Sequence, residues 1–116
     1  MSQNTKGLVL ITGTTSGVGL NTLKPLIRFG WEVIAVNRSN KRAIKIAEES
    51  LTKEEVKNIH FIEIDLSNLD DVRKGCDEIL ERFKKPINSL ICNAAVYKPR
   101  LKGPEGLLRG LKTLWQ

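Results

Sequence analysis

The sequence predicts an α/β fold: a doubly wound parallel sheet, of which this chain holds the N-terminal half. Short apolar runs alternate with segments of helical periodicity, which is the order of successive strand–helix–strand units. The apolar runs lack a polar face, as expected of parallel strands that are covered on both sides. A glycine-rich turn directly follows the first run. At 116 residues, the chain is expected to form one domain that buries a core.

Four strands are expected, at residues 8–12, 31–37, 60–65 and 89–92. Right-handed crossovers between successive parallel strands give the strand order 3-2-1-4, as in a Rossmann-type sheet. In such a sheet a ligand binds beyond the carboxyl ends of the strands. The residues that follow each strand are therefore the candidates for function.

Helices are expected between the strands. The first spans residues 18–29, and its inward stripe consists of Leu20, Leu23, Ile27 and Gly30. Ser39 is expected to cap the second, whose inward residues are Ala43, Ile44, Ala47 and Leu51. A capping box predicts a further short turn and is formed by Thr52 and Glu55. The last helix is expected to end at Pro86, with Ser67 and Asp70 at its cap and a buried stripe of Val72, Cys76, Ile79, Leu80 and Phe83.

The glycine-rich turn has the residue types that a dinucleotide pyrophosphate requires. Gly13 permits a tight turn off the strand, Gly17 lets backbone N–H groups approach the phosphates, and Gly19 lets the next helix pack closely. The helix N-terminus adds free N–H donors and a partial positive charge. An ordinary glycine-rich loop is the alternative interpretation. The predicted cofactor-binding residues of this turn are Gly13, Thr15, Ser16, Gly17, Val18 and Gly19.

The end of the second strand predicts which nicotinamide cofactor binds. The strand ends in Asn37 and Arg38, with Lys41 and Arg42 shortly after, and no carboxylate stands there to bind the ribose hydroxyls of NADH. A guanidinium can instead pair with a 2′-phosphate. We therefore expect NADPH, with Asn37, Arg38 and Arg42 at the site. The alternative for each basic residue is a solvated position at a helix start.

The third and fourth strands end in further candidates. Asp65 can accept a hydrogen bond from the adenine amino group, with Leu66 against the ring. Asn93 can fix the local backbone, and the small residues Ala94 and Ala95 leave room for a ribose and the nicotinamide. Each polar residue here has a simpler alternative role in a turn or a helix cap.

Taken together, these four strand ends resemble the short-chain dehydrogenase/reductase family. The Thr-Gly-x-x-x-Gly-x-Gly loop, the Asp-Leu after the third strand and the Asn-Ala after the fourth follow its order, although Ala95 stands where most members have glycine. The resemblance covers residues 7–106. The segment from Leu90 to Arg100 resembles the light-dependent reductases of this family. That resemblance implies hydride transfer from NADPH to a ring double bond of protochlorophyllide.

The same resemblance implies a catalytic Tyr-x-x-x-Lys pair, which this sequence lacks. Its single tyrosine is Tyr97, and Leu101 stands four positions later. We therefore assign no catalytic residue and expect a catalytically incomplete fragment. Residues 1–110 are expected to form an NADPH-binding half-domain. Residues 111–116 are interpreted as an aberrant or truncated tail that follows a frameshift, the alternative being a natural amphipathic end.

Composition limits the other possible functions. The net charge of +6 raises nucleic-acid binding as an alternative, but the basic residues are spread along the chain without interleaved aromatic residues. We expect no metal site, no membrane span and no transit peptide, and hence a cytoplasmic protein of cyanobacterial type. His60, the only histidine, is expected to be structural.

Two other interpretations of the function remain. The chain is a fragment of another NADP-dependent short-chain reductase, or it is a non-catalytic nucleotide-binding or interaction module. The exposed sheet edge also makes self-association of this chain an expectation.

Overall fold

The computed structural model describes residues 5–94. The predictions for Ala95, for Tyr97 and for the tail at 111–116 lie outside these residues. The described chain follows the predicted alternation of strands and helices.

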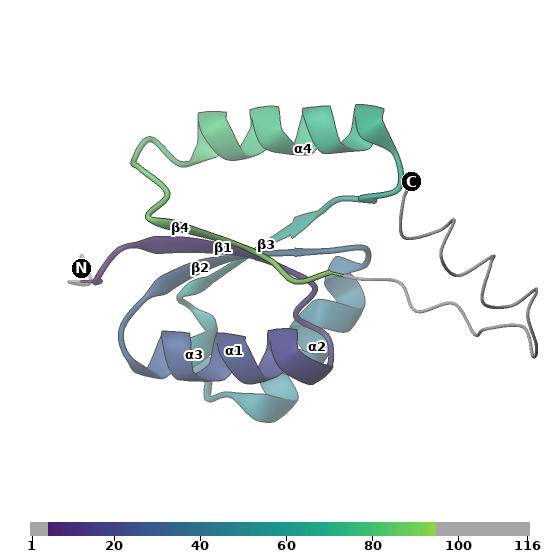
Figure 1. Ribbon diagram of the computed structural model, residues 1–116. Coiled ribbons are helices and arrows are strands. Elements are labelled where there is room, and N and C mark those ends of the chain that lie inside the picture. Colours follow the sequence, from purple (N-terminus) through teal and green to yellow (C-terminus); the bar gives the residue numbers. More distant parts are fainter. Residues whose placement is uncertain (1–4, 95–116) are drawn as a thin grey trace, which may run out of the picture.

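Four parallel strands form a single sheet in the order β3-β2-β1-β4, which confirms the predicted topology (Figure 1). The strands are β1 (Leu8–Thr12), β2 (Glu32–Asn37), β3 (Ile59–Glu63) and β4 (Ser89–Cys92). Only β3 departs from its predicted bounds by more than one residue, because it ends two residues early. Asp65 therefore lies in the loop beyond β3.

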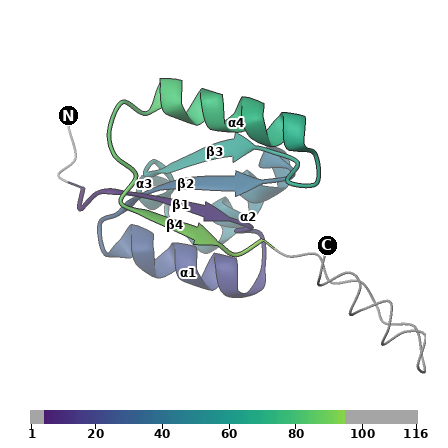
Figure 2. The same cartoon turned by 45° about the horizontal axis from the view of Figure 1, so that its top comes forward.

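Helices cover both faces of the sheet. On one face lie α1 (Gly17–Arg28), α2 (Asn40–Ser50) and the short α3 (Lys53–Val56), while α4 (Leu69–Arg82) lies on the other (Figures 1 and 2). Two apolar cores result. Leu23 and Ile27 of α1 pack with Val9, Ile11 and Val33 on the first face. Ile79 of α4 packs with Leu10, Ile34 and Ile62 on the second. Among residues 5–94, no helix is long and apolar enough to cross a membrane.

The helix caps agree with the sequence at two positions and differ at one. Ser39 caps α2 by accepting a hydrogen bond from the Arg42 N–H, and Thr52 and Glu55 form the expected capping box. The cap of α4 is Asn68, whose side chain accepts from the N–H groups of Asp70 and Asp71. The prediction of Ser67 was wrong because its hydroxyl is directed to the Asp65 carboxylate.

The predicted stripe of α4 was also wrong in part. Cys76 and Leu80 are exposed, and the buried positions are Gly75 and Ile79. A Cβ on Gly75 would lie 2.2 Å from Cδ1 of Ile64, so α4 packs against Ile64 at a position that has no room for a side chain. An apolar pattern does not register such a contact. The helix ends at Arg82, four residues before Pro86.

Two smaller corrections concern the other helices. Ile44 of α2 is exposed, whereas Ala43 and Ala47 face the sheet. Gly30 does not belong to the stripe of α1. It lies beyond the helix end with a φ of +94°, and the N–H of Trp31 donates to the carbonyl of Leu26, which closes the helix in a Schellman motif.

The strand register brings the functional candidates to one level. Thr12 at the end of β1 aligns with Val36 of β2 and with Cys92 of β4, and Asn37 aligns with Glu63 of β3. The residues after all four strands therefore meet at one edge of the sheet.

Candidate cofactor site

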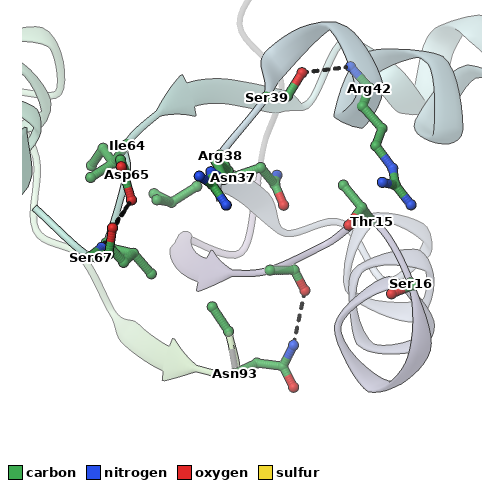
Figure 3. Close-up of a pocket in the computed structure, with 14 residues that line it drawn as sticks. Thr15, Ser16, Asn37, Arg38, Ser39, Arg42, Ile64, Asp65, Ser67 and Asn93 are labelled. Carbon is green, nitrogen blue, oxygen red and sulfur yellow. Dashed lines mark hydrogen bonds between the residues drawn. The ribbon is translucent and has the colours of Figure 1, made fainter. Parts of the chain in front are cut away.

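A cavity of about 630 Å³ opens at the carboxyl ends of the four strands (Figure 3). It is lined by residues from each strand end and from the first turn of α2. Ten of the residues predicted from the sequence line it: Gly13, Thr15, Ser16, Asn37, Arg38, Arg42, Asp65, Leu66, Asn93 and Ala94. Gly17, Val18 and Gly19 are not among the lining residues. The structure thus gathers candidates that lie up to 81 positions apart in the sequence.

The three glycines of the loop serve different geometric needs. Gly13 has a φ of +77°, and a Cβ there would lie 2.9 Å from Cα of Ala94. A Cβ on Gly19 would lie 1.7 Å from the carbonyl oxygen of Gly13, so α1 packs against the loop itself. Gly17 has a φ of +57° and open space around its missing side chain. Gly13 and Gly19 therefore shape the loop, while Gly17 leaves room beside it.

The start of α1 differs from the starts of the other described helices. Its cap residue, Ser16, is extended and makes no side-chain hydrogen bond to the helix. The caps of α2, α3 and α4 all accept such bonds. The first-turn N–H groups of α1 thus have no side-chain cap and no acidic neighbour in that turn. Such a helix start fits an anion.

Asn93 holds the loop from the side of β4. Its Nδ2 donates to the carbonyl of Gly13 at 2.9 Å, as expected for a residue that fixes local backbone. The N–H groups of Asn93 and Ala94 both donate to Oγ1 of Thr12, each at 3.0 Å. This role of Thr12 was not predicted from the sequence. A hydroxyl at the last residue of a buried strand, level with the end of a neighbouring strand, was the available signal.

Asn37 holds the loop from the side of β2. The N–H of Thr14 donates to Oδ1 of Asn37, and Nδ2 of Asn37 donates to Oγ1 of Thr14. Asn37 was predicted as a cofactor contact, and the structure directs its amide to the loop. Thr14 was missed, because nothing in the local sequence separates it from the exposed polar residues that follow.

Two basic residues, Arg38 and Arg42, line the cavity at the end of β2 and the start of α2. Arg38 is exposed at the end of β2, and Arg42 extends from the first turn of α2 toward the side where Thr15 lies (Figure 3). Two guanidinium groups from adjacent elements thus border a cavity that also contains the glycine loop. This arrangement can bind a ligand with separate anionic groups.

Asp65 supplies a negative charge near Arg38. Its Oδ1 accepts the hydroxyl of Ser67 at 2.6 Å and the N–H of Ser67 at 3.0 Å. These hydrogen bonds, helped by the charge of Arg38, hold the pKa of the Asp65 carboxyl below its usual value. The carboxylate therefore stays ionised and can accept a hydrogen bond from a ligand.

Comparison with known proteins adds to this geometry. Residues 7–106 match the short chain dehydrogenase family. The protochlorophyllide reductase of Cucumis sativus chloroplasts is 39% identical over 109 residues, which cover 92% of this chain and 26% of that protein. The protein of the same name from Pisum sativum is 43% identical over 101 residues, covering 85% of this chain and 24% of the relative. This chain spans about a quarter of the length of these relatives.

Solved structures agree on the fold. Menthone neomenthol reductase from Mentha piperita has a TM-score of 0.72 at 24% identity. The match covers 96% of this chain and 39% of that reductase. A 3-ketoacyl-(acyl-carrier-protein) reductase from Brucella melitensis, complexed with NADH, has a TM-score of 0.67 at 27% identity. The match covers 90% of this chain and 42% of that reductase. The sheet order, the glycine loop and the match over residues 7–106 lead to one conclusion: this chain belongs to the short-chain dehydrogenase family.

Proposed function

We propose that this chain is the NADPH-binding part of a protochlorophyllide reductase. The observation that carries the choice of cofactor is the end of β2, where Arg38 and Arg42 border the cavity and no carboxylate follows the strand. The relatives named above support the choice of enzyme, and belonging to the short-chain dehydrogenase family supports a nicotinamide cofactor.

The cavity, together with the glycine loop beside it, suits the parts of NADPH in order. The open space beside Gly17 and the N–H groups at the start of α1 suit the pyrophosphate. Arg38 and Arg42 suit the 2′-phosphate, while Asp65 and Leu66 suit the adenine. The small residue Ala94, beside Asn93, leaves room for the nicotinamide half.

Charge favours NADPH, with its additional 2′-phosphate, over NADH. A guanidinium forms strong, charge-assisted hydrogen bonds to a phosphate but gains much less from a ribose hydroxyl. Arg38 makes no ion pair within 4.0 Å in the described residues, so its donors are available to a ligand. The acidic neighbour Asp65 is engaged with Ser67.

In this proposal, the chain holds the hydride donor and does not complete the catalytic site. Bound NADPH supplies a hydride from its nicotinamide ring. The residues described here bind and orient that donor. Protochlorophyllide as the acceptor rests on the similarity to the named relatives and not on a residue of this cavity.

A calorimetric titration tests the proposal. We expect the purified chain to bind NADPH with one site and to bind NADH at least tenfold more weakly, the loss of roughly 1.5–3 kcal/mol typical of a charged hydrogen bond. Saturating NADPH should also raise the free energy of unfolding, by about 2.7 kcal/mol at a ligand concentration of 100 times Kd. Equal affinity for both cofactors, or no binding of either, contradicts the proposal.

A further inference from the structure

We infer that Asn37 is a positioning residue for the pyrophosphate, which acts through Thr14 and makes no contact with the cofactor itself. The inference rests on the proposed function, because it concerns how that same site holds NADPH. It separates two residues that are adjacent in the sequence, Asn37 and Arg38, into different roles.

The pair is reciprocal and buried. The Thr14 N–H donates to Oδ1 of Asn37 at 2.7 Å, and Nδ2 of Asn37 donates to Oγ1 of Thr14 at 2.8 Å. Thr14 is 2% exposed and Asn37 is 6% exposed, and they are the two buried polar residues of the described chain. Two antiparallel hydrogen bonds fix both the distance and the rotation of the loop relative to β2.

The side chain of Asn37 extends the strand ladder by one residue. The last backbone bond from β1 to β2 runs from the Gly13 N–H to the carbonyl of Val36, at 2.9 Å. The next donor along the chain is the Thr14 N–H, which bonds to the Asn37 side chain instead of to backbone. The Asn37 carbonyl in turn accepts from the Ile64 N–H at 3.0 Å. Asn37 thus connects the glycine loop to both β2 and the end of β3.

This bracing matters because the loop leads directly to the proposed phosphate site. Thr14 is followed by Thr15 and Ser16, which line the cavity, and then by Gly17 at the start of α1. On its other side the loop is held by Asn93 through the Gly13 carbonyl. Removing Asn37 would leave the buried Thr14 N–H without its acceptor, which a loop relieves by moving. A shifted loop carries its N–H groups away from the pyrophosphate.

Direct contact with the ribose is the competing role for Asn37, and two ligands distinguish the roles. NADPH contains the pyrophosphate, whereas adenosine 2′-monophosphate contains the adenine, the ribose and the 2′-phosphate only. We expect Asn37→Ala to weaken NADPH and NADH by the same factor, about tenfold. The affinity for adenosine 2′-monophosphate, measured by NMR titration, should stay within about twofold, since a positioning role leaves its contacts intact.

Changes at Thr14 provide independent evidence. Thr14→Ser keeps both hydrogen bonds and should bind NADPH like the wild type. Thr14→Val keeps the N–H but loses the hydroxyl, so it should weaken NADPH by a smaller factor than Asn37→Ala. Thr52→Ala is the control for general stability, because it removes a helix cap far from the cavity and should leave the affinity for NADPH unchanged.

The outcomes separate the inference from the proposed function. Wild-type chain that binds neither ligand overturns the proposed function and the inference with it. Wild-type chain that binds NADPH, together with an unchanged Asn37→Ala, overturns the inference alone. An equal loss of adenosine 2′-monophosphate affinity in Asn37→Ala also overturns it, in favour of direct contact. If Asn37→Ala does not fold, a weakened Thr14→Val beside an unchanged Thr14→Ser supports the inference, and equal affinities of both contradict it.

Discussion

The carbonyl oxygen of Gly13 occupies the space into which a side chain on Gly19 would project. A Cβ on Gly19 would lie 1.7 Å from that oxygen and 2.6 Å from Nδ2 of Asn93. The first turn of α1, the end of β1 and the end of β4 therefore meet at one point. This contact defines the shape of the loop. At Gly17, two residues earlier, no atom from outside its own turn of the chain lies within 4 Å of the missing side chain.

That difference predicts separate effects on stability and binding. Gly17→Ala should cost about 1–2 kcal/mol of stability, because its φ of +57° is strained for any L-residue. It should also weaken NADPH at least about tenfold, since the new methyl group enters the proposed phosphate site. Urea unfolding and calorimetry measure the two effects.

Gly30 is the matched control for this prediction. It has a φ of +94° and equally open surroundings, but it lies at the opposite end of α1. Gly30→Ala should therefore lose similar stability and keep its affinity for NADPH. Equal affinities in the two variants would mean that the phosphate does not bind beside Gly17.

A cluster around Glu32 lies at the amino ends of the strands, away from the cavity, and predicts that stability depends on pH. The Glu32 carboxylate, at the start of β2, accepts hydrogen bonds from Lys85 and pairs with His60. Burial acts to raise the pKa of Glu32, but these two partners outweigh it and hold the pKa below 4.5. The folded state thus favours the charged carboxylate. Its contribution is complete above about pH 4.5 and is lost as the pH falls through the lowered pKa.

Glu32→Gln tests this cluster. The variant should be less stable than the wild type by about 1 kcal/mol at pH 7, and the difference should shrink below pH 4.5. Glu54→Gln is the control, because its ion pair with Lys57 is exposed on both sides and should change stability little at any pH. Urea unfolding of the three proteins between pH 3 and pH 7 gives the comparison. If the difference in free energy of unfolding between Glu32→Gln and the wild type persists unchanged in acid, the ionised Glu32 carboxylate is not the source of that stability.

The sequence predicted the order of the sheet because that order follows from local patterns and general rules of handedness. It predicted most cavity residues for the same reason, since they lie at the ends of strands or within a few residues after them. It failed where close contact between distant segments decides the outcome. Gly75 packs so closely against Ile64 that no side chain fits between them, and no apolar periodicity marks such a position.

The polar contacts of the loop were predictable only from one side. Asn93 could be assigned because it follows a strand and precedes small residues. The pairing of Thr14 with Asn37 joins residues 23 positions apart, and the choice between them and their polar neighbours depends on which side chains become buried. Burial at that level follows from the assembled sheet and not from the local sequence.

The outer edge of β4 predicts self-association. In the described residues β4 pairs only with β1, and Leu90 in this strand is 62% exposed. An unpaired apolar edge offers backbone groups to a second chain. We expect concentration-dependent association in sedimentation velocity, and Leu90→Lys should reduce it by placing a charge on the edge. Leu80→Lys removes a similarly exposed leucine from α4 and should have less effect. The edge is not the contact if Leu80→Lys disperses the assemblies equally well.

The 116 residues should not by themselves reduce protochlorophyllide. They contain one tyrosine, Tyr97, with Leu101 four positions later, and therefore no Tyr-x-x-x-Lys pair. Positioning two reactants lowers the activation barrier by about 7–11 kcal/mol in favourable cases. Binding the hydride donor alone does not provide this lowering. Illuminated mixtures of the chain, NADPH and protochlorophyllide should form chlorophyllide only at the rate of a protein-free control. Product that increases with the concentration of the chain would contradict this expectation.

Arg38→Ala tests whether Arg38 recognises the 2′-phosphate of NADPH. Calorimetric titrations of wild type and variant with NADPH and with NADH form a cycle in which protein and phosphate are each changed once. We predict that Arg38→Ala weakens NADPH by about ten- to a hundredfold and changes NADH by less than about twofold. Lys45→Ala, which removes an exposed positive charge of α2 outside the cavity, should leave both affinities nearly unchanged. An equal loss of NADPH and NADH affinity in Arg38→Ala would contradict the assignment of the 2′-phosphate to this residue.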